Sequence, residues 1–170
     1  MGVTTYAGRT RRALLHKSNS TYWCAIGRTT AWDVESAPPS PSPGATNIDE
    51  AIVFVLPSVV SLCKPVDTGE DVTVNGQGYA FVADVDAMTE GARFLYLKTV
   101  YNPADGIPTA NFRQNAVFTE LEPAAGYENN QWLAPINVSD VGVLEYLSNH
   151  LERSLGVGEQ RVIETIIEFR

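Results

Sequence analysis

The residue types that could carry metal or nucleophilic chemistry are few and scattered in this chain of 170 residues. Two cysteines and two histidines stand alone, with no pair at the i, i+3 or i, i+4 spacing of helical metal ligands; they are Cys24, Cys63, His16 and His150. No nucleophile elbow surrounds any serine or cysteine that could pair with a histidine. The pattern predicts no metal, no cofactor and no catalytic centre, and it predicts buried, reduced thiols.

Two further patterns resemble functional motifs but are explained by a purely structural role. Gly76-Gln77-Gly78 lacks the lysine and the following helix of a phosphate-binding loop. Two neighbouring carboxylates can serve acid-base catalysis when their environments give them different pKa values. In this chain the neighbouring carboxylates fall in polar, turn-like segments, at Asp67, Glu70, Asp71, Asp84 and Asp86. We expect a solvated acidic rim at these positions.

Charge is distributed unevenly along the chain. The net charge is −8, which argues against a dedicated nucleic-acid binder. Residues 1–32 hold five basic residues and no acid, so they carry +5, whereas the other 138 residues hold 7 basic and 20 acidic residues and carry −13. This basic segment is interpreted either as a surface that docks on an acidic neighbouring subunit or on nucleic acid, or as a solvated helix face.

The hydropathy of the sequence indicates no membrane segment. No apolar run approaches the roughly 18 residues of a membrane span, and the N-terminus lacks the apolar region of a signal peptide. We expect a protein that is made and kept in a cytoplasm and has no membrane partner.

The secondary structure expected from the pattern is mainly strand. Residues 8–18 favour a short helix, and Ser139 could cap a second helix over residues 140–152. Between them lie strand-length apolar runs: residues 21–27, 51–56, 59–63, 72–74, 79–83, 93–100 and 112–118. Asn75-Gly76 predicts a tight hairpin turn because both residues accept positive φ. The end of the chain, 161–169, favours a closing strand, although its spacing also fits a helix.

Two segments are expected to be irregular. Residues 36–47 contain four prolines, which remove backbone donors and exclude helix or central strand, so this piece is predicted to be an extended surface arm. Residues 122–137 are predicted to form a long loop pinned by Trp132. Trp32 precedes the proline-rich arm and is predicted to pack on a core edge or another chain, or to plug its own domain.

These motifs together resemble those of baseplate wedge proteins from contractile-tailed bacteriophages and of a set of smaller phage virion proteins. The first is Ile-Gly-Arg-Thr-Thr-Ala-Trp (26–32), followed by Asp33, Glu35 and the Pro-Pro-Ser-Pro run at 38–41. The smaller proteins are also similar at Gly8 to Leu14, at Phe112 to Leu121 and at the closing strand Thr165 to Phe169. The resemblance implies a non-enzymatic structural subunit of a phage tail, baseplate or neck, assembled in the host cytoplasm, with no catalytic residue to carry over.

The sequence therefore predicts one mainly β domain over residues 1–170. We expect it to be sandwich-like or barrel-like, with short N-terminal and C-terminal helices and long loops. Its expected partners are other virion proteins and copies of itself. Residues 9–47 are predicted to supply the intersubunit surface, and the residues named for it are Arg9, Arg11, Arg12, Arg28, Trp32, Pro38, Pro39 and Pro41. Replacing Trp32 and Arg28 by Ala is expected to leave the monomer folded and block assembly.

Two other functions remain open at this point. One is a free-standing β-sandwich module that grips a carbohydrate or host-surface ligand with Trp23, Trp32 or Trp132. The other is a small hydrolase that uses Cys24 or Cys63 with a histidine, which requires a thiol of lowered pKa.

Overall fold

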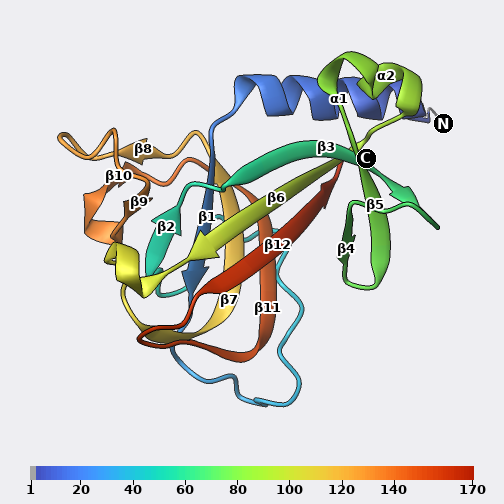
Figure 1. The fold of residues 1–170 in the computed structure, drawn as a ribbon. Coiled ribbons are helices and arrows are strands. Elements are labelled where there is room, and N and C mark those ends of the chain that lie inside the picture. Colours follow the sequence, from blue (N-terminus) through green and yellow to red (C-terminus); the bar gives the residue numbers. More distant parts are fainter. Residues whose placement is uncertain (1–2) are drawn as a thin grey trace. The chain divides into compact units, whose positions relative to one another are not determined.

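The computed structural model describes residues 3–170 of the chain. They form two compact units, which are described separately: residues 3–20, 58–98 and 163–170 make the first, and residues 21–57 and 99–162 make the second. Most regular structure is strand, so the expected mainly β fold class is confirmed (Figure 1). That residues 1–170 make a single domain stays a prediction.

The first unit begins with helix α1 (Tyr6–Asn19), which confirms the helix predicted over residues 8–18. The Thr5 hydroxyl caps its first turn by accepting a hydrogen bond from Gly8 N at 3.2 Å. The short helix α2 (Ala87–Glu90) lies beside α1 (Figure 1). Just before α2, the 3-10 turn η1 (Asp84–Asp86) brings a carboxylate to Lys17 at 2.6 Å.

A five-stranded sheet in the order β12-β6-β3-β5-β4 completes this part of the fold. Its strands are β3 (Val59–Val66), β4 (Val72–Val74), β5 (Gln77–Val82), β6 (Phe94–Tyr101) and β12 (Arg161–Glu168). The predicted Asn75-Gly76 hairpin is confirmed, since β4 and β5 pair across it and both residues have positive φ. The closing strand is confirmed as β12. Cys63 and Tyr96 belong to the buried cluster of this unit.

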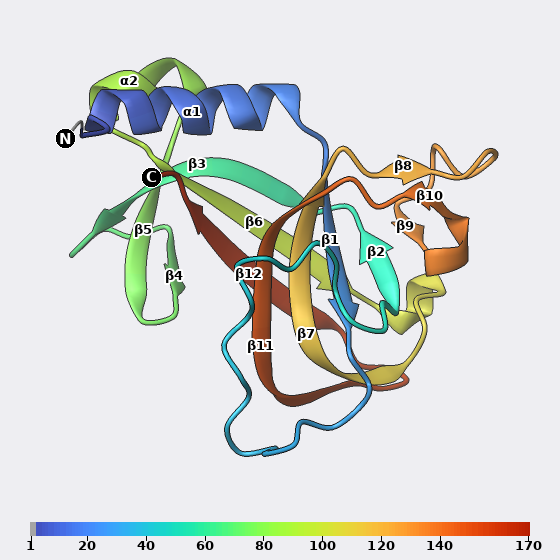
Figure 2. The same cartoon turned by 180° about the vertical axis from the view of Figure 1, so that it is seen from behind.

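A second five-stranded sheet, in the order β11-β7-β1-β2-β9, forms the centre of the second unit. Its strands are β1 (Tyr22–Gly27), β2 (Val53–Val55), β7 (Ala110–Thr119), β9 (Trp132–Leu133) and β11 (Val143–Leu155). Figure 2 shows β1, β7 and β11 side by side. Every residue of β1 is buried, and the rings of Phe54 and Phe118 meet edge to face at 5.5 Å in the core.

The segment predicted as a long loop, residues 122–137, contains two short strands and a 3-10 turn. β8 (Glu122–Pro123) pairs with β10 (Val138–Asp140) to make a two-stranded ribbon, and η3 (Pro135–Asn137) leads into β10. Trp132 pins the segment as predicted, because its indole N–H donates to the carbonyl of Asp105, at the end of η2 (Pro103–Asp105), at 2.9 Å.

The helix predicted over residues 140–152 is wrong, because this segment is strand β11. β11 pairs with β7 along nearly its whole length, and two register shifts interrupt the alternation of its side chains. Those shifts explain the apolar spacing that looks helical, and pairing with a buried neighbour overrides it. Ser139 does not cap a helix: its hydroxyl donates to the carbonyl of Glu122 at 3.0 Å.

Candidate functional site

The most extensive polar network among the described residues ties residues 28–50 to strands β7 and β11. We call residues 28–50 the arm segment; it contains the proline-rich arm 36–47 and has neither helix nor strand, as the prolines predict. It leaves the end of β1, runs alongside β11 and returns to β2 (Figure 2). The network lies wholly in the second unit.

The arm segment starts at a tight crossing of two backbones. Arg28 takes a positive φ of 56°, and its N–H donates to the carbonyl of Asp49 at 2.7 Å. A Cβ on Gly27 would lie 2.5 Å from that carbonyl oxygen, which is closer than a Cβ can approach. Glycine at position 27 therefore permits the two ends of the arm segment to meet.

Arg28 and Trp32 form a stacked pair within the chain. The guanidinium lies 3.9 Å from the centre of the indole ring, and its Nη1 pairs with Asp49 Oδ2 at 3.0 Å. Trp32 is only 8% exposed, and its indole N–H donates to the His150 carbonyl at 3.0 Å. The structure therefore places this tryptophan against its own chain, one of the positions that the sequence left open.

Arg113 is the buried centre of the network. Its side chain is 7% exposed and projects from β7, where Nε donates to Glu35 Oε1 at 2.7 Å and Nη1 donates to the Thr29 carbonyl at 2.6 Å. Nη2 pairs with the Glu152 carboxylate on β11. The hydrogen bond from Arg113 is the main cause that lowers the pKa of Glu35 below its usual value. One guanidinium thus joins the arm segment to two strands.

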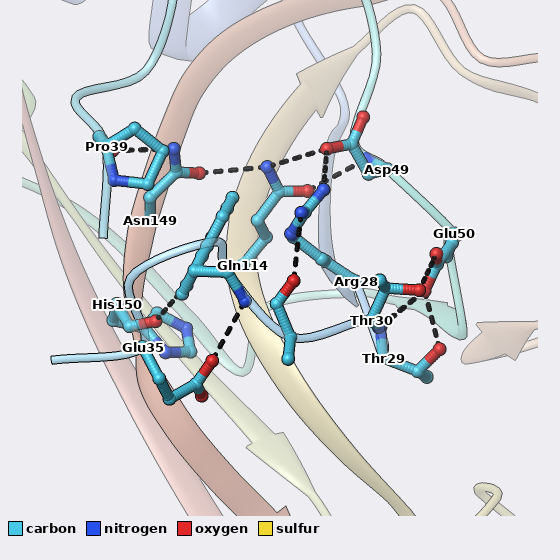
Figure 3. A network of polar contacts seen from close by, with 12 residues as sticks. Arg28, Thr29, Thr30, Glu35, Pro39, Asp49, Glu50, Gln114, Asn149 and His150 are labelled. Atoms are coloured by element: carbon cyan, nitrogen blue, oxygen red, sulfur yellow. Dashed lines mark hydrogen bonds and ion pairs between the residues drawn. The ribbon is translucent and has the colours of Figure 1, made fainter. Parts of the chain in front are cut away.

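A second carboxylate closes the turn at the start of the arm segment. Glu50 accepts four hydrogen bonds, from the backbone N–H groups of Thr29 (2.7 Å) and Thr30 (2.9 Å) and from both hydroxyls (2.5 Å each). The hydroxyl of Thr29 contributes most, followed by that of Thr30, and together these bonds lower the pKa of Glu50 to about 2. Figure 3 shows the carboxylate facing both threonines.

A chain of amides connects the middle of the arm segment to the sheet (Figure 3). Gln114 Oε1 accepts from Asp49 N at 2.8 Å, and its Nε2 donates to Asn149 Oδ1 at 2.9 Å. Asn149 Nδ2 then donates to the Pro39 carbonyl at 2.8 Å. The proline-rich arm is therefore attached to β11 through the side chain of Asn149, which donates to the Pro39 carbonyl.

His150 lies beneath this network in its neutral form. Its Nδ1 lies 2.7 Å from the Leu151 carbonyl, its Nε2 is buried without a hydrogen-bond partner among residues 3–170, and its ring meets Phe112 edge to face at 5.4 Å. Burial lowers the pKa of His150, and the nearby charges of Arg153 and Arg161 lower it further. A second proton would place a charge on a buried nitrogen, so His150 acts here as a packed side chain.

The structure places the predicted interface residues in two groups. Arg28, Trp32, Pro38, Pro39 and Pro41 belong to the arm segment in the second unit. The other three lie on α1 in the first unit: Arg9, half-buried with its guanidinium 5.6 Å from the Tyr6 ring, and the exposed Arg11 and Arg12. Their role in contacts between subunits stays a prediction.

Sequence reasoning missed the residues that hold the arm segment. Arg113, Gln114 and Asn149 were not singled out for this role, and neither was Glu50. A signal exists for two of them, because Arg113 and Gln114 are polar residues in the buried part of strand β7. Such residues need partners, since an unpaired buried charge is costly. Their partners in the arm segment are 65 to 84 positions away in the sequence. Their partners on β11 are 35 to 39 positions away.

The groups required by the two other functions are occupied or buried. Burial raises the pKa of both Cys24 and Cys63 to about 12, the opposite of an activated thiol, and both are free and buried as predicted. Trp23 is 3% exposed, so like Trp32 it presents no open ring face to a sugar. Trp132 is half-buried, and its indole N–H is bonded to the Asp105 carbonyl. Across residues 3–170 there is no cluster of three or more potential metal ligands, and no helix there is long and apolar enough to span a bilayer.

Comparison with known proteins identifies the family. A family model described as baseplate wedge 3 tail fiber network component matches residues 1–169. The chain is also 30% identical over 160 residues to virion protein 3 of Enterococcus phage phiEF24C, an alignment that covers 91% of this chain and 87% of the relative. The predicted resemblance is therefore confirmed, and the chain belongs to the baseplate wedge 3 tail fiber network component family of bacteriophage structural proteins.

Proposed function

We propose that this protein is a non-enzymatic structural subunit of a phage baseplate that acts through protein-protein contacts during assembly in the host cytoplasm. Its partners are other virion proteins and further copies of the chain. The observation that carries the proposal is the arm segment, in which buried polar side chains hold an irregular, proline-rich stretch in one conformation.

The chemistry of the network supports a structural role. Arg113, Glu35 and Glu50 have their hydrogen-bonding capacity directed at the protein itself. A catalytic or ligand-binding site would need some of these groups aimed at an open cavity. The network instead orders the arm segment before any partner arrives, which lowers the conformational entropy lost on binding.

The surface of the arm segment is suited to contact another protein. Val34 is 58% exposed, and Pro39, Ser40 and Pro43 are exposed as well. Proline restricts the backbone, so an exposed stretch of this kind loses little freedom when a neighbour packs on it. Arg28 and Trp32 have a positioning role in this proposal, since both are used to hold the exposed residues in place.

The test is quantitative mass spectrometry of gradient-purified particles, which counts this chain against the major capsid protein. A small, fixed copy number is expected for a baseplate subunit. Absence of the chain from particles would overturn the proposal and return attention to a separate binding module.

A paired variant experiment then tests the arm segment. Val34→Asp together with Ser40→Asp alters the exposed surface and leaves the network intact, so the chain is expected to fold normally and to be lost from particles. Val157→Asp together with Ser154→Asp is the matched control, because it adds the same two charges at exposed positions outside the arm segment. Equal incorporation of both variants would remove the arm segment from the interface.

A further inference from the structure

The outward face of α1 carries two unpaired cations around an exposed leucine. Arg11, Arg12 and Leu15 are all exposed, and the spacing of three and four residues places them together on the helix surface. Leu15 is 47% exposed. Nothing in the described part of the chain pairs with Arg11 or Arg12, whereas Lys17 is paired with Asp84 and Arg9 lies over Tyr6.

The β8–β10 ribbon of the second unit has the opposite character. Glu122 and Asp140 are both exposed and face each other directly across the two strands. Like charges in that position destabilise a strand pair. No lysine, arginine or histidine occurs between residues 114 and 149, a stretch that contains five acidic residues. The ribbon therefore presents two exposed carboxylates that a cationic partner would neutralise.

An exposed apolar residue accompanies these acids. Ile136, in the η3 turn that leads directly into β10, is 88% exposed. The ribbon and the turn before it thus present two carboxylates and one exposed isoleucine, and α1 presents two guanidinium groups and one exposed leucine. The two surfaces match in charge and in the presence of one apolar residue each.

We propose that the outward face of α1 in one copy of the chain binds the β8–β10 ribbon of a second copy. Arg11 and Arg12 donate to the carboxylates of Glu122 and Asp140, and Leu15 packs on Ile136. The inference rests on the proposed function, because it names one partner of a structural subunit. Because each copy carries both surfaces, two copies can exchange the contact reciprocally, or each copy can bind the next in a chain.

The size of the helix determines how strong this contact is. α1 has 14 residues, which corresponds to a length of about 21 Å, so the contact is smaller than a standard stable interface. Its attraction is mainly between exposed charges, which salt screens. We therefore expect self-association of the full chain at low ionic strength and high protein concentration, with dissociation as salt is raised.

Charge exchange between two full-length variants tests the pairing. Arg11→Glu with Arg12→Glu makes the outward face of α1 acidic, and Glu122→Lys with Asp140→Asn makes the ribbon basic. Asn is chosen at 140 because it keeps the Oδ1 acceptor that Gly142 N uses at 2.8 Å. Sedimentation velocity at low salt should show each variant alone as a monomer and their equimolar mixture as associated, because each mixed contact again joins opposite charges.

Matched controls carry the same changes in charge at other exposed positions. Arg153→Glu with Arg170→Glu replaces the helix variant, and Asp67→Lys with Glu70→Gln replaces the ribbon variant. Both controls should self-associate as the natural sequence does. Circular dichroism confirms that each variant is folded before it is compared.

Three results would overturn the inference. These are a natural chain that stays monomeric at low salt and millimolar concentration, a mixture of charge variants that fails to associate, or controls that lose association to the same extent. A monomeric chain that is nevertheless present in particles at fixed copy number would leave the proposed function standing and remove only the contact between copies. Absence from particles would instead count against the proposed function.

Discussion

The guanidinium of Arg113 donates to the carboxylate of Glu35 at 2.7 Å although the two residues lie 78 positions apart in the chain. Arg113 belongs to a central strand, and Glu35 belongs to the irregular arm segment just before its prolines. The same guanidinium also pairs with Glu152 on β11. One buried side chain thus joins the irregular arm segment to two strands, alongside the bonds made by Trp32, Gln114 and Asn149.

Replacing Arg113 by Met should release the arm segment. Met keeps most of the apolar volume but removes the guanidinium from Glu35, Glu152 and the Thr29 carbonyl, while Glu35 keeps Trp32 N and Glu152 keeps Asn111 Nδ2 as donors. Because both carboxylates are more than 40% exposed and solvent screens their charges, we expect a loss of only about 1–2 kcal/mol in the free energy of unfolding. Urea denaturation measures it. Arg170→Met is the control, since that side chain is 83% exposed beside Glu168 and should change little.

Replacing Trp32 by Ala should expose the arm segment to proteases. The change removes a large buried ring and its hydrogen bond to the His150 carbonyl, at a cost of about 3–5 kcal/mol. Limited proteolysis should then cut between residues 33 and 47. Trp32→Phe keeps a ring beneath the Arg28 guanidinium and should be cut much more slowly. Equal cleavage of the two variants would show that the stacked pair does not hold the arm segment.

Glu50 should make the protein sensitive to acid in a defined range. Its pKa in the folded state is about 2, below the usual 4.5, so its stabilising contribution is fully present above pH 4.5 and disappears as the pH falls towards 2. The melting temperature measured between pH 5 and pH 2 should fall more steeply for the natural chain than for Glu50→Gln. Parallel curves for the two proteins would contradict this expectation.

His150 should titrate below the usual histidine pKa of 6.5, chiefly because it is buried. The folded state therefore binds its proton less readily than the unfolded state, and stability associated with His150 is present above pH 6.5 and declines below it. Titration of the ring Cε1–H resonance by NMR reports the midpoint directly. A midpoint at or above 6.5 would show that the ring is more accessible than the structure indicates.

Gly27→Ala should disturb the crossing at the start of the arm segment. The new Cβ would lie 2.5 Å from the Asp49 carbonyl oxygen, so one of the two backbones must move, at a cost of about 1–3 kcal/mol. Gly44→Ala is the matched control within the same segment, because the nearest atom to its Cβ is the Ser42 hydroxyl at 3.8 Å. Thermal unfolding of both variants gives the comparison, and similar melting temperatures would show that the crossing tolerates a side chain.

The sequence by itself determined the elements whose backbone conformation depends on residues close together in the chain. Asn75-Gly76 predicts the hairpin because both residues accept positive φ, and the prolines of residues 36–47 predict an irregular arm because they remove donors. The helix α1 and the closing strand β12 follow from propensity. The phage family could be predicted as well, and a family model matches residues 1–169.

Tertiary structure decided the rest, because the deciding partners are distant in sequence. The apolar spacing at residues 143–151 fits a helix until pairing with β7 and two register shifts make it a strand. The sequence around Trp32 is compatible both with an anchor for another chain and with a core residue. Only the folded chain shows that its indole nitrogen lies 3.0 Å from the His150 carbonyl oxygen. Arg113 shows the same limit: sequence marks it as a charge in a buried strand, whereas only the fold supplies the two carboxylates that make its burial tolerable.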